Sequence, residues 1–321
     1  MALLALCPLL SCAEPEPVVD LYLDAVAMRE LGQNELAIER LNAVVRTDPE
    51  FTLAYSELGK AHEAVGAYKE AASAYRRASR LDPWSIENSL GLARTSEELE
   101  KHSEAADAYR RTVELDPENV EALLGAARCS LKADEYVRAL ALCEQAEQAG
   151  AEPDEVYRLL ARIYEAQENY VRAVSAYKRL LASDPQNAAT LLALGIAHTK
   201  AEQYEAAQRV LSSVAQMRPE DGTAYRHLGY CFARRRRADE AIEMYKRSVE
   251  LDDRDWEAHR GLGVAYMLKA QQSGEPGWTQ KAVEHWRRSL AIRPDQPKRL
   301  TLEKLIREHA KLENPLQGLN D

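Results

Sequence analysis

The sequence has few cysteines, only two phenylalanines and too little positive charge for several classes of protein. Its 321 residues include five cysteines with no Cys-x-x-Cys pair, which argues against a disulfide scaffold or a zinc cluster. Lys and Arg number 42 against 52 Asp and Glu, which gives a net charge of −10. Because phosphate backbones are bound by dense cationic surfaces, we expect no nucleic-acid partner.

Motifs of the common enzyme classes are also missing. The sequence has no Gly-rich phosphate loop, no G-x-S-x-G and no His-Glu-x-x-His, and its seven histidines are dispersed. Internal repeats fill most of the chain and leave no stretch of about a hundred residues for a catalytic domain. We therefore expect no enzyme activity, no cofactor and no catalytic or metal-binding residues.

The N-terminus contains an apolar run of about ten residues, too short to span a bilayer but suited to a signal peptide. It ends in Leu9-Leu10-Ser11-Cys12, which resembles the lipobox of bacterial lipoproteins, although no Lys or Arg precedes the run. The resemblance implies a signal peptide over 1–11, a lipidated Cys12 and a tether over 12–17, in a periplasm-facing protein of the bacterial cell envelope. The alternative is a cytoplasmic protein whose leader is not processed.

A period of 34 residues runs through most of the sequence. "AYRRASRLDP" at 74–83 returns as "AYRRTVELDP" at 108–117 and as "AYKRLLASDP" at 176–185. Boundary prolines follow the same spacing, with seven extra residues in the last repeat before Pro294. Such a period is typical of stacked helical repeats. The register defines repeats 1 to 8 as 18–51, 52–85, 86–119, 120–153, 154–187, 188–221, 222–255 and 256–294.

Each repeat has the pattern of two amphipathic helices. In repeat 2, apolar residues follow helical spacing from Tyr55 to His62 and from Tyr68 to Ala78, with a helix stop at Val65-Gly66-Ala67. One position on each helix is always Gly or Ala, as expected where two helices cross closely. The pairs are Ala25/Ala37, Gly59/Ala71, Ala93/Ala105, Ala127/Ala139, Ala161/Ala173, Gly195/Ala207, Gly229/Ala241 and Gly263/Ala282.

These features resemble the tetratricopeptide repeat family, whose 34-residue unit has the pattern W-x-x-L-G-x-x-Y, A-x-x-x-F and P. The resemblance covers about 18–294 and implies an all-α fold, a right-handed α-solenoid of about eight helix pairs whose first helices line a concave groove. Residues 297–313 place Leu302, Leu305, Ile306 and Leu312 on one stripe, which predicts a capping helix before a tail at 314–321. His62, His198, Cys129, Cys143 and Cys231 hold apolar or aromatic positions of the repeat, so we expect them in the core.

A row of cations marks the face that the resemblance places in the groove. Position 9 of successive repeats reads Val26, Lys60, Arg94, Arg128, Arg162, Ile196, Tyr230 and Val264, and position 5 adds Arg158, Arg226 and Arg260. Because guanidinium groups bind carboxylates bidentately, the expected partner is a protein with an extended or helical, acidic peptide segment. The predicted groove residues are Lys60, Arg94, Arg128, Arg158, Arg162, Arg226, Tyr230 and Arg260.

The alternative interpretation of these cations is a solvated ladder. Arg94 has Glu97 and Glu98 at intrahelical spacing, as Arg158 has Glu155 and Arg162 has Glu165, and such pairs would neutralise the row. Position 6 of the repeats holds no Asn, so the peptide clamp for chaperone tails known in the family is not supported.

Two further features lie between helices of the last repeats. Arg234 to Arg237 form a basic turn in repeat 7, for which solvent exposure is the simplest interpretation and an acidic or lipid contact the alternative. The insertion near 271–278 is expected to lengthen the corresponding turn of repeat 8, where Trp278 either contacts a partner or folds back on the stack.

The functional expectation is a non-catalytic scaffold for protein–protein contacts, anchored to a membrane through Cys12. By resemblance, such lipoproteins assist the assembly or recruitment of envelope proteins. A cytosolic adaptor is the first alternative. A regulatory subunit or enzyme that binds a small anionic ligand in the groove is the second.

Overall fold

The computed structural model describes residues 17–310, which form seventeen α-helices and no strand. The predicted all-α repeat fold is confirmed. Cys12, the signal peptide, most of the tether and the tail at 314–321 lie outside the described residues. None of the described helices is long and apolar enough to cross a membrane.

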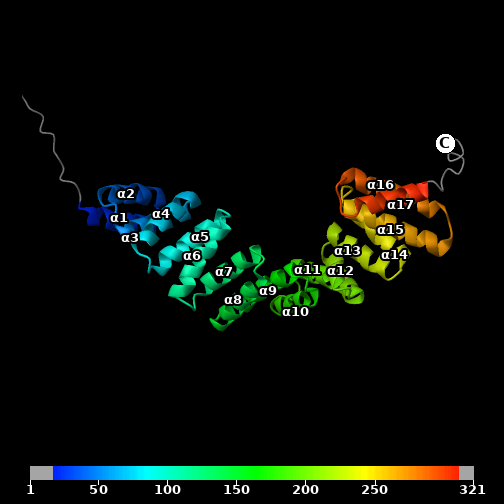
Figure 1. The fold of residues 1–321 in the computed structure, drawn as a ribbon, viewed down its shortest axis with the longest axis horizontal. Coiled ribbons are helices and arrows are strands. Elements are labelled where there is room, and N and C mark those ends of the chain that lie inside the picture. Colours follow the sequence, from blue (N-terminus) through cyan, green and yellow to red (C-terminus); the bar gives the residue numbers. More distant parts are fainter. Residues whose placement is uncertain (1–16, 311–321) are drawn as a thin grey trace, which may run out of the picture. The chain divides into compact units, whose positions relative to one another are not determined.

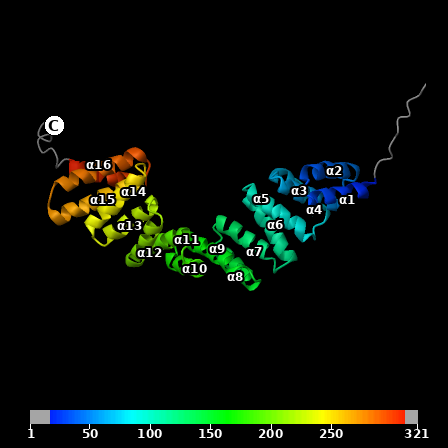
Figure 2. The same ribbon diagram turned by 180° about the vertical axis from the view of Figure 1, so that it is seen from behind.

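The chain divides into two compact units, residues 1–151 and 152–321. In each unit, helices that are neighbours in sequence pack against one another (Figures 1 and 2). The N-terminal unit contains α1 (Val18–Glu30), α2 (Asn34–Thr47), α3 (Thr52–Ala64), α4 (Tyr68–Leu81), α5 (Ile86–Glu98), α6 (His102–Leu115), α7 (Val120–Lys132) and α8 (Tyr136–Gln148). The C-terminal unit contains α9 (Pro153–Ala166), α10 (Tyr170–Ser183), α11 (Ala188–Lys200), α12 (Tyr204–Met217), α13 (Gly222–Arg234), α14 (Ala238–Leu251), α15 (Trp256–Ser273), α16 (Gly277–Ile292) and α17 (Arg299–Ala310).

First helices of successive repeats also contact one another directly. The contacts join α1 to α3, α3 to α5 and α5 to α7 in the N-terminal unit, and α11 to α13 and α13 to α15 in the C-terminal unit. Within each unit these odd-numbered helices therefore form one continuous surface, which we call the first-helix face.

Local chemistry explains where the helices begin and end. Asn119, Asp221 and Asp255 stand at repeat boundaries, and the side chain of each accepts a hydrogen bond from a backbone N–H of the first turn that follows. At the predicted stop in repeat 2, Gly66 has φ +73° and the Ala67 N–H donates to the His62 carbonyl at 2.9 Å. One predicted boundary is displaced, because Pro153 begins α9 and belongs to the first turn of that helix.

The predicted small-residue pairs are the points of closest helix packing. Every alanine of the eight pairs is fully buried. At Gly59, an added Cβ would lie 2.6 Å from the Tyr75 ring, so even a methyl group does not fit there. The register deduced from these pairs is therefore the register of the core.

The seven inserted residues of repeat 8 lengthen its helices, and our expectation of a longer turn is wrong. Helix α15 has 18 residues where α13 has 13, and α16 has 16 where α14 has 14. The turn Gly274–Pro276 is as short as the turn in repeat 7, because helical extension keeps every added backbone group hydrogen-bonded. Trp278 folds back on the stack, with its ring 5.7 Å from that of Tyr266.

Helix α17 follows the last repeat and packs on α16. It begins and ends inside the predicted range 297–313. Leu302 is buried, and Leu305 and Ile306 pack against the hydrophobic cluster that contains Trp286. Leu312 lies outside the described residues.

Candidate functional site

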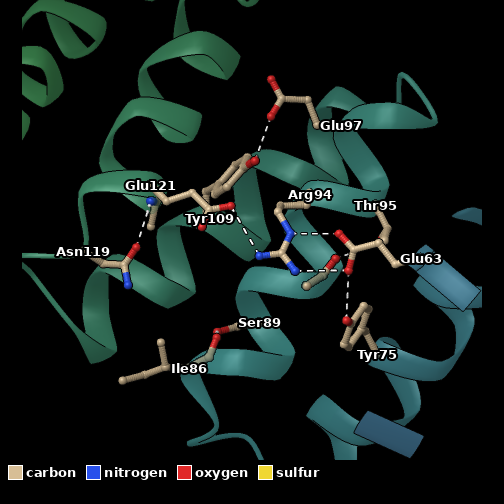
Figure 3. A network of polar contacts seen from close by, with 12 residues as sticks. Glu63, Tyr75, Ile86, Ser89, Arg94, Thr95, Glu97, Tyr109, Asn119 and Glu121 are labelled. Carbon is tan, nitrogen blue, oxygen red and sulfur yellow. Dashed lines mark hydrogen bonds and ion pairs between the residues drawn. The ribbon is translucent and has the colours of Figure 1, made fainter. Parts of the chain in front are cut away.

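A polar network recurs on the first-helix face of the N-terminal unit (Figure 3). Glu63, near the end of α3, accepts a hydrogen bond from the Tyr75 hydroxyl at 3.0 Å. The same carboxylate binds the guanidinium of Arg94 on α5 bidentately, through Nε at 2.9 Å and Nη2 at 3.1 Å. We call this arrangement the Tyr–Glu–Arg triad. It links the two helices of one repeat to the first helix of the next.

The triad repeats one period later. Glu97 accepts from the Tyr109 hydroxyl at 2.7 Å and from Arg128 at 2.8 and 3.0 Å. Burial opposes the ionisation of Glu97, but the hydrogen bonds from Arg128 and Tyr109 outweigh it and lower the pKa of the carboxyl. The charge of each arginine is therefore matched by a carboxylate that the fold holds in place.

The structure thus pairs four of the seven predicted groove cations, but with unexpected partners: Lys60, Arg94, Arg128 and Arg226. Lys60 contacts Glu57 at 2.8 Å and Glu87 of the next repeat at 2.5 Å. Arg94 does not pair with Glu97 or Glu98 of its own helix, as the ladder interpretation expected. It reaches Glu63 in the preceding repeat and Glu121 in the following one, at 2.9 and 3.4 Å.

Arg158 and Arg162 differ from Lys60, Arg94 and Arg128. Both are exposed on α9. Within the described part of the C-terminal unit neither forms an ion pair, so the predicted pairs with Glu155 and Glu165 are not formed. They are free charges on α9 and offer a matched control for experiments on the remaining cations.

A pocket of about 620 Å³ opens on the first-helix face of the C-terminal unit. Helices α13, α15 and α17 form its walls, together with the end of α11 and the segment before α17. Of the predicted groove residues, Arg226, Tyr230 and Arg260 line it. Apolar wall residues are Ala233, Val264, Trp286, Leu302 and Leu305. Sequence reasoning missed this pocket because α17, read only as a cap, supplies one of its walls.

Positive charge at the pocket is only partly compensated. Arg226 donates to both carboxylate oxygens of Asp255 at 3.1 and 3.0 Å and lies 2.8 Å from Glu257. Arg234 lies 3.6 Å from Glu202. The remaining three lining cations have no carboxylate partner among the described residues: Lys200, Arg260 and Lys298.

Arg260 is held at the pocket without being neutralised. Its Nη1 donates to the Pro297 carbonyl at 3.3 Å, and its guanidinium lies 4.8 Å from the centre of the Trp256 ring. Nearby, burial and the charges of Arg226 and Lys200 lower the pKa of His227 to about 4. His227 is therefore neutral at pH 7 and adds no charge. The pocket combines an apolar wall with free cationic groups, a surface suited to a ligand that carries a carboxylate.

The basic turn of repeat 7 is largely paired within the protein. Arg235 contacts Glu205 at 2.8 Å, and Arg237 contacts Glu240 at 2.9 Å and covers the Phe232 ring. Arg234 stacks over Tyr204 and Tyr230 at the pocket edge. The turn is thus mainly a solvated structural element.

The histidines and cysteines of the repeats form no candidate metal site. Cys129, Cys143 and Cys231 are buried, and burial raises the pKa of the Cys143 thiol to about 12. His198 is buried and contacts Gln203 at 2.6 Å, whereas His62 is only half-buried. Over residues 17–310, no group of three or more His, Cys, Asp or Glu is arranged to hold a metal ion.

Two sequence models of the tetratricopeptide repeat match the chain. One matches residues 98–163 and 164–229, and the other matches 23–84 and 236–297. A curated relative, small glutamine-rich tetratricopeptide repeat-containing protein 2 of Mycosarcoma maydis, is 37% identical over 75 residues, which are 23% of this chain. The chain spans about a fifth (21%) of that relative's length.

Several solved structures are similar. A tetratricopeptide repeat protein from Parabacteroides merdae has a TM-score of 0.54 and 16% identity, over 77% of this chain and 98% of that one. The Cut9–Hcn1 hetero-tetramer of APC/C gives 0.51 and 17%, over 85% and 52%. PilW, a widely conserved type IV pilus biogenesis factor, gives 0.50 and 17%, over 63% and 94%. At sequence identities of 16% and 17%, these similarities show a shared fold and nothing about function.

Proposed function

Because the chain belongs to the tetratricopeptide repeat family, we propose that it is a non-catalytic scaffold that binds protein segments on its first-helix face, with the pocket of the C-terminal unit as the main docking point. The partner segment is extended or helical and acidic. Binding of other proteins is the role that this repeat fold generally supports.

One observation carries the proposal. The pocket presents three cations without carboxylate partners beside an apolar wall, in a chain whose net charge is −10. In the N-terminal unit, the predicted groove cations Lys60, Arg94 and Arg128 are paired with the protein's own carboxylates. The pocket is therefore the place on the first-helix face where an external carboxylate gains most.

The test is affinity capture with the full chain as bait, from a membrane extract of the source organism. Arg260→Glu reverses the free charge at the pocket without removing an internal ion pair. Arg162→Glu is the matched control, since it reverses an equally free charge on α9, outside the pocket. Circular dichroism confirms that both variants fold.

The expected result is a specific protein that wild type and Arg162→Glu retain and that Arg260→Glu loses. Chemical cross-links from that protein should map to α13, α15 or α17. A scaffold that retains no protein at all contradicts the proposed function. Retention that is equal in all three baits places the docking surface elsewhere.

We also propose that Cys12 anchors the chain to the cell envelope. The support is the Leu9-Leu10-Ser11-Cys12 pattern, which lies outside the described residues. Mass spectrometry of the purified N-terminus and membrane fractionation of Cys12→Ser test it. A wild-type chain that stays in the soluble fraction with residues 1–11 intact favours the cytoplasmic adaptor. Assistance in assembling envelope proteins is part of this proposal and depends on the anchor.

A second candidate is a regulatory protein that binds a small anion. The pocket volume of about 620 Å³ falls in the range of small-molecule sites and favours it. Native mass spectrometry distinguishes the two candidates. A small acidic molecule retained by the chain, without any captured protein, would support the second.

A further inference from the structure

The pocket lies where the Tyr–Glu–Arg triad has lost two of its three members. Tyr245 holds the repeat position of Tyr75 and Tyr109. The position of the triad glutamate is taken by Ala233, and the position of the triad arginine by Val264. Both replacements line the pocket, as does Tyr245 itself. The missing side chains therefore account for much of the open space.

The Tyr245 hydroxyl is a donor without a partner among the described residues. The residue is only 3% exposed, and over residues 17–310 its hydroxyl makes no hydrogen bond. The hydroxyls of Tyr75 and Tyr109 each donate to a carboxylate. Burial raises the pKa of Tyr245, so the hydroxyl keeps its proton and remains a donor. Because Tyr245 lines the pocket, a group that enters the pocket can accept this hydrogen bond in place of solvent.

Two glycines fix the direction of that hydroxyl. A Cβ added at Gly229 would lie 2.8 Å from Cγ of Tyr245, and one added at Gly261 would lie 2.6 Å from its hydroxyl oxygen. The ring is thus clamped between the two helices in the same way as the rings of Tyr75 and Tyr109, which meet Gly91 and Gly125. The donor is pre-positioned for a carboxylate that residues 17–310 do not supply.

Cationic groups for that carboxylate are present although the triad arginine is not. Arg260 lies one helical turn before Val264 on α15, lines the pocket and has no carboxylate partner among the described residues. The charges of Arg260 and Arg226 both act on the Tyr245 hydroxyl. A carboxylate next to Tyr245 would therefore meet one hydroxyl donor and a free guanidinium, the two kinds of group that hold Glu63.

We propose that this pocket binds a glutamate side chain of an acidic partner peptide, whose carboxylate takes the place of the missing triad carboxylate. The Tyr245 hydroxyl donates to it, Arg260 pairs with it, and the peptide's apolar groups lie on Val264, Leu302 and Leu305. A peptide glutamate is the favoured occupant because the absent group is itself a glutamate side chain and because the surroundings are both cationic and apolar. This inference rests on the proposed function and names the ligand group of the same site.

The test uses two fluorescein-labelled twelve-residue peptides of Ala and Leu that differ only in one central Glu or Gln. Fluorescence anisotropy measures their binding to the full chain. Wild type should bind the Glu peptide about tenfold more tightly than the Gln peptide. Tyr245→Phe, which removes only the hydroxyl, should reduce that preference to less than about threefold.

Two more variants complete the design. Ala233→Glu supplies the triad carboxylate from within the chain and should abolish binding of the Glu peptide. Tyr109→Phe is the matched control, because it removes the same hydroxyl from an intact triad and should leave binding unchanged. If Ala233→Glu fails to fold, the comparison of Tyr245→Phe with Tyr109→Phe still decides the question.

Equal affinity of wild type for the two peptides overturns the inference, as does a Glu preference that survives in Tyr245→Phe. If neither peptide binds but glutarate raises the melting temperature of wild type and not of Tyr245→Phe, the pocket holds a small carboxylate and the peptide assignment is wrong. These outcomes are distinct from failure of the proposed function, which is measured by capture of a protein partner with Arg260→Glu and Arg162→Glu.

Discussion

Removing the carboxylate of Glu97 tests whether the Tyr–Glu–Arg triad stabilises the stack. In Glu97→Ala, the Tyr109 hydroxyl, on a residue that is only 1% exposed, loses its acceptor at 2.7 Å. A buried hydroxyl left without a partner costs about 1–3 kcal/mol. The pair with Arg128, whose side chain is 38% exposed, adds at most about 1 kcal/mol because solvent screens it. We expect a total loss of about 1–4 kcal/mol.

Urea unfolding followed by far-UV circular dichroism measures this loss for the transition of the N-terminal unit. Glu98→Ala is the control, since Glu98 is exposed on the same helix turn and should change the free energy of unfolding by less than about 0.5 kcal/mol. Glu97→Gln keeps an acceptor for Tyr109 and should cost about 1 kcal/mol. If Glu97→Ala is no more destabilising than Glu98→Ala, the triad does not stabilise the fold and our account of the network is wrong.

Three further perturbations follow from the same contacts. The pKa of Glu97 is lowered in the folded state. Its contribution to stability is therefore present above the unfolded pKa of about 4.3 and is lost as the pH falls through the folded pKa. The free energies of unfolding of wild type and Glu97→Gln, measured in urea, should become equal in acid. Gly125→Ala places a Cβ 2.3 Å from Cζ of Tyr109 and should cost about 2 kcal/mol or more in the same assay. Gly277→Ala, with open space around it, should leave the unfolding of the C-terminal unit nearly unchanged. Glu100 adopts a left-handed φ of 56°, so Glu100→Gly should raise the free energy of unfolding by about 1 kcal/mol; a decrease would show that other contacts of Glu100 outweigh the backbone strain.

The fold follows from the sequence because its rules are local and repeated. The period sets the helix pairs, and the Gly and Ala positions set their closest contacts; all twelve alanines of those pairs are fully buried. The insertion in repeat 8 contains Gly274 and Pro276, which indicate a turn and do form one, and this is why the sequence predicted that the whole insertion lengthens the turn. The other inserted residues extend α15 and α16. Whether inserted residues extend a helix or a turn depends on their packing against neighbouring helices, which the sequence pattern does not show.

The site was less predictable because it depends on partners one period away. Arg94 and Glu63 are 31 residues apart, so the intrahelical neighbours Glu97 and Glu98 are the more obvious partners in the sequence. The signal that could have found the true pairs is the recurrence of Glu at position 12 in the repeats that precede Arg94 and Arg128. The wall that α17 adds to the pocket has no such signal, because it depends on how the cap docks.

Comparison of equivalent positions within the chain separates structural sites from the binding site. In repeat 6 the tyrosine position holds Leu211, which fills its space against Gly195 and leaves no polar group to satisfy. In repeats 2 and 3 the tyrosine is present and the chain satisfies it with a carboxylate. In repeat 7 the tyrosine remains, its glutamate is replaced by Ala233, and the following repeat replaces the arginine with Val264. The chain thus keeps a hydroxyl at the edge of the pocket and supplies no acceptor for it among residues 17–310, as expected if a bound carboxylate accepts its hydrogen bond. The same register thus closes the stack where the triad is whole and opens a site for a carboxylate where two of its side chains are missing.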